Sequence, residues 1–340
     1  MIPDSVLPVP LLPVPGGPEL LTLGESMVSL RSAGPLSAGG ALGMHVAGAE
    51  SNVAVGVARL GHRVGWAGVV GADPHGEFIL RQLRSEGIAV QHRKDASRST
   101  GVMFLEQRTA DVTRAFYYRA GSAGSTLSRD DVEAAFRSGV RVLHLTGITA
   151  ALSQEARRAV EYAAARAAGE GLDVSLDVNY RSKLWSRDEA RAVLTPLARH
   201  ASILIASDDE LGLVACGETA DSCTGTAGDA ETAMAAELLG HGVREVVVKR
   251  GAAGAGVHTA AGRWETPAVP VTSIDTVGAG DAFTAGYLSA LLDGEDVAGR
   301  LQRGALAGAF AVSTAGDWEG LPRRDELALL GATPSGTTQR

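Results

Sequence analysis

Short apolar runs alternate with amphipathic helical stretches through most of this 340-residue chain, and this alternation constrains the fold more than any other feature. Buried parallel strands are continuously apolar and are joined by helical crossovers. The pattern therefore predicts an α/β fold with a central, mostly parallel sheet and helices on both faces. The predicted strands are Val64–Val70, Val140–Thr146, Leu172–Val178, Ile203–Ala206 and Val243–Lys249.

The stretches between and after these runs follow the helical period. The predicted helices are Asn52–Leu60, Glu77–Glu86, Gln154–Ala168, Ala230–Leu239, Asp281–Leu292 and Val297–Val312. The last two are rich in Ala and Gly, so we expect them to pack closely with each other or against a flat ligand such as a nucleobase.

Two segments break the α/β rhythm, because they contain strand-like pieces with no helix between them. These pieces are Met27–Arg31, Val102–Glu106 and Thr113–Tyr118. Antiparallel strands inserted into a parallel design usually form a separate sheet, so we expect a small antiparallel sheet built from residues of about 26–47 and 99–121.

The charge balance and the termini exclude several classes of protein. With 31 basic and 39 acidic residues, the net charge of −8 argues against a nucleic-acid surface. No apolar run is long enough to span a membrane. We expect a disordered Pro-rich tail over residues 1–18, one domain over 19–330 and a loose tail over 331–340. Cys216 and Cys223 match neither a disulfide framework nor a zinc pattern, so we expect reduced thiols in a cytoplasmic protein.

The segment Asp275–Phe283 carries the chemistry. Gly278 and Gly280 let consecutive N–H groups turn toward one point at the start of a predicted helix, which makes an anion site. Asp281 inside that site is explained if it takes a proton from a hydroxyl while the amides of Ala279, Gly280 and Asp281 hold a phosphoryl group. The alternative is a glycine-rich turn with Asp281 as an ordinary helix N-cap.

This segment resembles the signature of the ribokinase-like (PfkB) family of sugar kinases, and the resemblance extends from about Leu21 to about Leu330. Further matches point to the 2-keto-3-deoxygluconate kinase branch. The resemblance implies a ribokinase-like fold in which the small sheet is a lid over the substrate. Because an exposed sheet edge is a liability, such lids often pair between subunits, and we expect a homo-oligomer.

Two segments resemble the substrate-binding parts of that branch. In the first, Gly48, Ala49, Glu50 and Asn52 match a Gly-x-x-x-Asn motif that binds sugar hydroxyls, although Ser51 or Asn52 as a plain helix cap accounts for the same residues. In the second, Tyr117, Tyr118 and Arg119 would stack on a sugar and pair with its acid group, since Arg suits a carboxylate. The family often has a Tyr near Met103, which cannot donate a hydrogen bond. Asp317 is a weaker candidate for substrate contact.

Nucleotide and metal ligands are expected at the carboxyl ends of the predicted strands, where α/β proteins bind ligands. Arg181 would reach the transferred phosphate or the substrate carboxylate. Glu210, and Asp177 through water, would hold Mg²⁺, although Ser207 and Glu210 also fit a helix capping box. A monovalent cation near Asp275 is expected only by analogy with relatives. The expected nucleotide-binding residues are Asn179, Arg181, Ser207, Lys249, Gly251, Gly254, Gly278 and Gly280.

The sequence as a whole predicts an ATP-dependent kinase of an acidic keto sugar, with a small-molecule sugar acid and ATP as its partners. The nearest alternative is a fructokinase- or ribokinase-type enzyme acting on a neutral sugar. A non-catalytic sugar- or nucleotide-binding regulator is a third hypothesis, and the intact Asp281, Gly278 and Gly280 argue against it.

Overall fold

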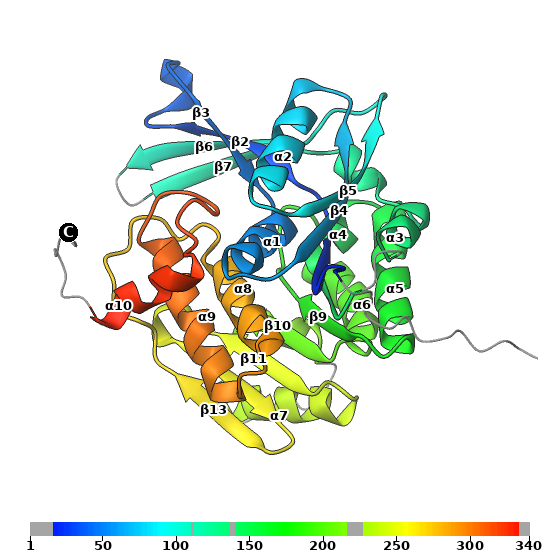
Figure 1. Ribbon diagram of the computed structural model, residues 1–340, viewed down its shortest axis with the longest axis vertical. Helices are drawn as coiled ribbons and strands as arrows, with labels where there is room; N and C mark the ends of the chain where they lie inside the picture. Colours follow the sequence, from blue (N-terminus) through cyan, green and yellow to red (C-terminus); the bar gives the residue numbers. More distant parts are fainter. Residues whose placement is uncertain (1–15, 110–111, 137–139, 216–226, 333–340) are drawn as a thin grey trace, which may run out of the picture.

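The computed structural model describes residues 16–332 except 110–111, 137–139 and 216–226 (Figure 1). Cys216, Cys223 and most of both predicted tails lie outside the described residues, so the predictions for them stay predictions. Residues 331 and 332 still belong to the short helix α10 (Leu329–Ala332).

A nine-stranded sheet forms the centre of the part of the chain that the structure describes. Its order is β13-β12-β11-β10-β9-β8-β1-β4-β5, and all neighbours are parallel except in the hairpin β11-β12-β13 at one edge. The five predicted strands are confirmed, with ends shifted by at most two residues, whereas β1, β5 and the strands β12 and β13 were not predicted. The strands are β1 (Leu20–Leu23), β4 (Val64–Gly71), β5 (Ala89–Asp95), β8 (Val142–Thr146), β9 (Asp173–Asp177), β10 (Ile203–Ser207), β11 (Glu245–Lys249), β12 (Ala255–Thr259) and β13 (Gly262–Thr266).

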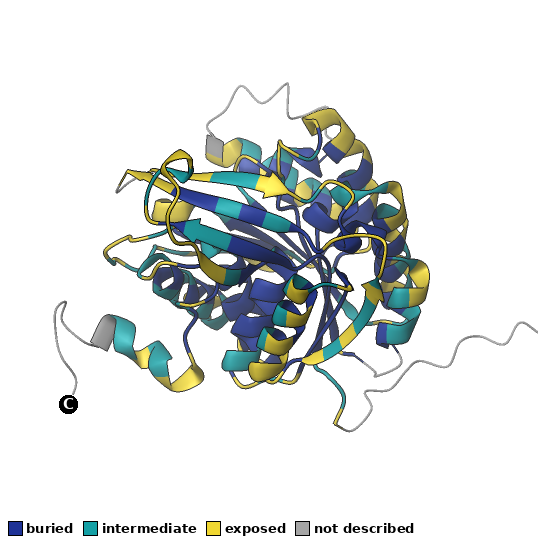
Figure 2. Ribbon diagram, turned by 90° about the horizontal axis from the view of Figure 1, so that it is seen from above, coloured by how far each residue is buried: buried dark blue, intermediate teal, exposed yellow. Residues whose placement is uncertain are grey.

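Helices cover both faces of this sheet, as predicted, and each face has its own apolar core. Successive strand residues point to opposite faces, so Leu204 joins one core and Ile205 the other. Figure 2 shows the strands in the middle of the sheet as buried and the outward sides of the helices as exposed. One core packs against α3 (Arg129–Phe136), α4 (Gly147–Leu152), α5 (Gln154–Gly169), α6 (Arg187–Ala198) and α7 (Ala227–Gly240). The other packs against α1 (Ala49–Arg59), α2 (Pro74–Ser85), α8 (Ala279–Leu292) and α9 (Val297–Val312).

The Ala- and Gly-rich helices α8 and α9 pack against each other. A Cβ at Gly286 would lie 2.5 Å from the carbonyl oxygen of Arg303, so the glycine is what lets the two backbones approach. Of the two roles that the sequence suggested for these small residues, mutual packing is the one that the structure shows.

A second, four-stranded sheet lies apart from the first, as predicted (Figure 1). Its order is β3-β2-β6-β7. The pairs β2–β3 and β6–β7 are antiparallel, while β2 and β6 run parallel in the middle. We call it the small sheet; its strands are β2 (Met27–Ser32), β3 (Gly43–Ala47), β6 (Val102–Thr109) and β7 (Val112–Tyr118).

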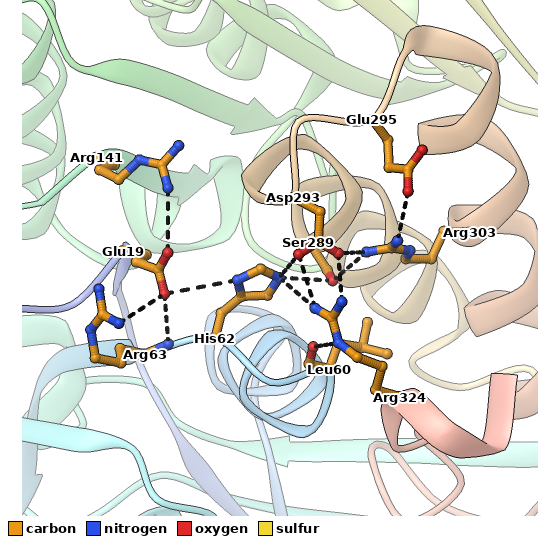
Figure 3. A network of polar contacts seen from close by, with 10 residues as sticks. All are labelled: Glu19, Leu60, His62, Arg63, Arg141, Ser289, Asp293, Glu295, Arg303 and Arg324. Carbon is orange, nitrogen blue, oxygen red and sulfur yellow. Dashed lines mark hydrogen bonds and ion pairs between the residues drawn. The ribbon is translucent and has the colours of Figure 1, made fainter.

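Away from the small sheet, a polar network joins segments that are distant in sequence (Figure 3). His62 lies between Glu19 and Asp293, and its Nε2 is 3.1 Å from Ser289 Oγ. Asp293 pairs with both Arg303 and Arg324. The network therefore ties the start of β1, the end of α1, the end of α8 and the C-terminal segment together.

Within the residues described, no helix combines the length and apolarity required to cross a bilayer.

Candidate active site

A cavity of about 800 Å³ opens between the small sheet and the loops at the carboxyl ends of the central strands. Ten residues that the sequence singled out line it, and they come from five separate segments of the chain. They are Gly48, Ala49, Glu50, Asn52, Tyr117, Arg119, Arg181, Gly278, Asp281 and Asp317. The fold therefore assembles one site from motifs up to about 270 residues apart.

Asp281 lies in the first turn of α8 and faces this cavity. Its carboxylate accepts hydrogen bonds from Asn52 Nδ2 (2.8 Å) and Asn179 Nδ2 (3.3 Å), and it has no ion pair with a described residue. Burial raises the pKa of the Asp281 carboxyl; the hydrogen bond from Asn52 opposes this rise, and the charge of Asp177 adds to it. A buried carboxylate with a raised pKa is suited to accept a proton.

Gly278 sets the loop in front of Asp281. It is the N-cap of α8 in the left-handed conformation (φ 74°), so the N-cap role that the alternative assigned to Asp281 is taken by a glycine. A Cβ at this position would also lie 2.2 Å from the carbonyl oxygen of Asp317. The first N–H groups of an α-helix have no partner within the helix. That of Ala279 donates to the Thr276 carbonyl at 3.3 Å, whereas those of Gly280 and Asp281 have no backbone acceptor among the described residues and can face an anion.

The first turn of α1 uses its polar side chains for the cavity rather than for capping. Gly48, with φ 146°, is the N-cap and receives no side-chain capping bond, so the prediction of Ser51 or Asn52 as a plain cap is wrong. Asn52 instead binds Asp281. Glu50 is buried, and its Oε1 accepts from the hydroxyls of Thr146 (2.6 Å) and Thr149 (2.5 Å). Burial raises the pKa of Glu50, and these hydrogen bonds offset only part of the rise.

The aromatic pair on β7 divides between the two faces of the small sheet. Tyr117 lines the cavity, whereas Tyr118 is 68% exposed and packs edge-on against Phe104 on the other face. The prediction that Tyr118 contacts the substrate is wrong, because successive side chains of a strand point to opposite faces. Arg119 lines the cavity but pairs with the buried Glu25, a partner that no sequence pattern indicated.

At the ends of β9 and β11, Lys249 Nζ donates to Asp177 Oδ2 at 2.6 Å, and the Thr284 hydroxyl donates to the same oxygen at 3.1 Å. Asp177 Oδ1 is buried and has no hydrogen-bond partner among the described residues. A Cβ at Gly280 would lie 3.4 Å from Lys249 Nζ, so this ammonium group sits directly beside the amide loop. Asn179 adopts a left-handed backbone (φ 42°), which directs its side chain to Asp281.

Glu210 organises the loops around it. Its carboxylate accepts from the backbone N–H groups of Tyr180 (2.7 Å) and Ser207 (2.9 Å). Ser207 Oγ donates to Asp209 instead of capping a helix, and only the 3₁₀ turn Leu211–Leu213 follows. The prediction of a helix opening at Ser207 is therefore wrong.

Three cations that line the cavity come from one loop and the helix after it. Lys183 Nζ donates to the Ala115 carbonyl of the small sheet and lies over the Tyr117 ring. Neither Lys183 nor Arg181 nor Arg187 pairs with a carboxylate in the described part of the chain. Arg181 is exposed, and its charge lowers the pKa of Asp281, against the net rise. Sequence reasoning found Arg181 and missed the other two.

The remaining predicted residues lie at the edges of the site. Asp317 Oδ2 accepts from Arg31 at 2.7 Å, and Asp275 Oδ2 is 3.3 Å from the same guanidinium. Burial raises the pKa of Asp317 to about 7, although the Arg31 charge acts to lower it. Gly251 and Gly254 form the turn between β11 and β12 with positive φ, and neither lines the cavity.

No group of three His, Cys, Asp or Glu side chains in the described ranges is arranged to hold a metal ion by itself. Magnesium is commonly held by one or two carboxylates together with water and substrate phosphates, and the partnerless Asp177 Oδ1 fits that arrangement.

Comparison with known proteins gives consistent matches along the chain. A family model described as pfkB family carbohydrate kinase matches residues 19–324. The chain is 34% identical over 317 residues to the 2-dehydro-3-deoxygluconokinase of Bacillus subtilis (strain 168), which covers 91% of this chain and 94% of that protein. It is 35% identical over 319 residues to the 2-dehydro-3-deoxygluconokinase of Thermoproteus tenax, with coverage of 92% and 94%. The crystal structure of a putative Ribokinase II from E. coli in complex with ATP and Mg²⁺ matches with a TM-score of 0.82 at 25% identity, covering 92% of this chain and 98% of that one.

Proposed function

The chain belongs to the pfkB family of carbohydrate kinases, and from this premise we propose that it transfers the γ-phosphoryl group of ATP to the terminal hydroxyl of 2-keto-3-deoxygluconate. The observation that carries the proposal is Asp281, a buried carboxylate with a raised pKa beside the amides at the start of α8 and open to the cavity. Relatives named 2-dehydro-3-deoxygluconokinase support the choice of substrate.

In the proposed reaction, Asp281 accepts the proton of the sugar hydroxyl as its oxygen bonds to the γ-phosphorus. The bond from the γ-phosphorus to the bridging oxygen breaks, and ADP leaves with that electron pair. Asn52 and Asn179 hold the carboxylate in place, and the amides of Gly280 and Asp281 stabilise negative charge on the transferring group. Lys249 adds a positive charge at this loop.

Bound Mg²⁺ would supply charge neutralisation between the β- and γ-phosphates. Asp177, through its partnerless Oδ1, and Glu210, which keeps free lone pairs beside its two backbone bonds, would accept hydrogen bonds from the water around the ion. The Arg31 guanidinium lies 3.3 Å from Asp275 Oδ2, and the monovalent cation expected near Asp275 stays a prediction.

The cationic side chains of the cavity differ in how readily they can pair with the carboxylate of the sugar. Arg119 already forms an ion pair with Glu25, whereas Arg181, Lys183 and Arg187 have no carboxylate partner among the described residues. A sugar carboxylate is therefore favoured by these three, and it would also share Arg119 with Glu25. Glu50 and Asn52 provide the acceptors and donors that suit sugar hydroxyls.

A substrate panel tests the proposal. ADP release should be measured with 2-keto-3-deoxygluconate, its C4 epimer, fructose and ribose, in wild type and in Arg181→Gln. We expect the acidic sugars to have the highest kcat/KM and Arg181→Gln to weaken them by about 10- to 100-fold with little effect on neutral sugars. Higher kcat/KM on fructose or ribose would contradict the proposal and favour the fructokinase- or ribokinase-type alternative.

The outer face of the small sheet supports the expected homo-oligomer. Tyr118 is exposed there beside Phe104, and Met44 is exposed on the same face, so a second copy would cover these apolar groups. We expect Tyr118→Ser to reduce self-association in light scattering while leaving the turnover of the remaining assemblies unchanged; an unaltered mass for Tyr118→Ser would argue against this interface. The cytoplasmic location stays a prediction.

A further inference from the structure

Three consecutive residues after α9 each contact the small sheet, and the proposed mechanism uses none of these contacts. Asp317 Oδ2 accepts a hydrogen bond from Arg31 of β2 at 2.7 Å. Trp318 Nε1 donates to the carbonyl oxygen of Val46 in β3 at 2.9 Å. Glu319 Oε1 lies 2.7 Å from Nδ1 of His45, also in β3. We call residues 317–319 the coupling segment.

The backbone of the coupling segment packs on the loop that carries Asp281. The carbonyl oxygen of Asp317 occupies the space beside Gly278 where a Cβ would come within 2.2 Å. Asp275, at the start of the same loop, accepts from the backbone N–H groups of Val277 (3.0 Å) and Gly316 (3.3 Å). The loop before α8 and the loop after α9 therefore hold each other through the Asp275 carboxylate and through close backbone packing at Gly278, which leaves little room for one to move alone.

Arg31 joins this pair of loops to the small sheet. Its Nη2 binds Asp317, and its Nη1 lies 3.3 Å from Asp275 Oδ2, so one guanidinium spans both loops. The Arg31 side chain is only 17% exposed, and its buried Nε has no hydrogen-bond partner in the part of the chain that the structure describes. An ion pair this sheltered is screened less by solvent than a surface pair, and Arg is suited to two acceptors at once.

We propose that Arg31 and the coupling segment transmit the position of the small sheet to the amide loop at Gly278, and that Arg31 is a positioning residue for the transfer step. The inference rests on the proposed function and on the expectation from the sequence that the small sheet is a lid over the sugar. Met27, which is four residues before Arg31 on β2, lines the cavity. Contact of β2 with a bound sugar therefore fixes the position of Arg31. Arg31 in turn fixes the positions of Asp275 and Asp317, and these two residues fix the amides that receive the phosphoryl group.

Arg114 provides a matched control. It also belongs to the small sheet, on β7, and it pairs with Glu106 of β6 at 3.5 Å, so its ion pair stays inside the sheet. Arg31→Gln removes an arginine that pairs with two carboxylates, Asp275 and Asp317, and Arg114→Gln removes one that pairs with Glu106 alone. Only the first variant loses a link to the amide loop.

Amide hydrogen exchange, followed by mass spectrometry, tests the link without any sugar. In Arg31→Gln we expect peptides covering residues 275–283 to exchange about 10-fold faster than in wild type, with no change at that segment in Arg114→Gln. In the sugar-dependent assay, kcat/KM of Arg31→Gln should fall by about 10- to 100-fold, as for loss of a charged hydrogen bond, and Arg114→Gln should stay within about 2-fold of wild type. Arg31→Lys, which keeps the charge but not the fork, should recover part of the loss.

Equal exchange over 275–283 in the two glutamine variants would overturn the coupling, and so would equal kinetics. If Arg31→Gln does not fold, Glu319→Gln replaces it: faster exchange over 275–283 supports the coupling and unchanged exchange overturns it. Failure of the proposed function is a separate result, because it would show as wild-type protein that phosphorylates no sugar of the panel while the exchange experiment still gives an answer.

Discussion

Replacement of Asp281 by Asn removes the proposed base and leaves a side chain of almost the same size. Loss of one positioned base commonly lowers turnover by about 10²- to 10⁴-fold, which corresponds to about 3–5 kcal/mol in the activation barrier. We expect kcat to fall by this factor while the Kd for ATP stays within about 2-fold of wild type, because the amides of the α8 N-terminus remain.

The structure also predicts that this variant folds at least as stably as wild type. Asn at 281 presents one oxygen and one NH₂ group where the carboxylate accepted from both Asn52 and Asn179. The Oδ1 of Asn179 is buried and has no partner within the described ranges, so a half-turn of that amide offers an acceptor to the new NH₂ group. This rotation preserves a hydrogen bond that would otherwise cost about 0.5–1.5 kcal/mol.

Ionisation of the buried Asp281 carboxyl lowers the stability of wild type, so the variant gains stability relative to wild type at high pH. Because the folded-state pKa of Asp281 is raised above its ordinary value of 3.8, wild type loses stability as the pH rises through the folded pKa. Asn carries no such dependence. The stability gain of Asp281→Asn should therefore be larger at pH 8 than at pH 4, close to the ordinary pKa of the group.

Urea unfolding at both pH values and an ADP-coupled assay test these expectations together, with the exposed Asp188→Asn as the control. Turnover of Asp281→Asn within about 10-fold of wild type would exclude Asp281 as the base. A loss of more than about 2 kcal/mol in unfolding free energy at pH 8 would refute the reasoning on burial and amide rotation.

Three further predictions follow from other parts of the structure. Gly278→Ala adds about 1–2 kcal/mol of backbone strain and a contact with the Asp317 carbonyl, so turnover should fall at least about 100-fold in protein that still folds by circular dichroism; normal turnover would show that the loop tolerates a side chain. Burial lowers the pKa of His144 to about 4, so stability present above pH 6.5 should fall by about 2 kcal/mol between pH 7 and pH 5 in urea unfolding, and this fall should be absent from the His144→Gln variant. Asp293→Asn breaks pairs with Arg303 and Arg324 far from the cavity, so it should lower the unfolding free energy by about 1–2 kcal/mol without changing the KM for sugar or ATP; an altered KM would contradict a purely structural role.

The sequence could predict the central strands and the amide loop because both depend on local patterns. Runs such as Ile203–Ala206 are apolar at every position, and a glycine three residues before an aspartate at the start of an apolar helix is typical of an anion site. The strands β12 and β13 were missed because they are short and partly polar, with Gly256 and Gly262 inside them. β5 was missed because its half-exposed residues, such as Arg93 and Lys94, do not form an apolar run.

The partners of the site residues could not be predicted, because they are distant in the sequence. Glu25 meets Arg119, and Arg31 meets residues 244 and 286 positions further along the chain. No local pattern records such a pairing. Tyr118 shows a different limit: the sequence indicated a strand, but the pairing register decides which of two adjacent tyrosines faces the cavity.

The distribution of charge around the cavity explains how one site can attract two anions, the phosphates and the sugar carboxylate, although it also contains carboxylates of its own. Glu25 and Asp177 are fully buried and each neutralises one cation, Arg119 and Lys249 respectively. These cations are thereby held in fixed positions before any ligand arrives, and the burial cost of the charges is met within the protein. A ligand anion then contacts Arg181 and the amides before Asp281. The Arg181 guanidinium has no carboxylate partner among the described residues that it would have to release. Since Arg181 also opposes the rise in the pKa of Asp281, an anion that neutralises Arg181 would make Asp281 a stronger base at the moment when the sugar hydroxyl must lose its proton.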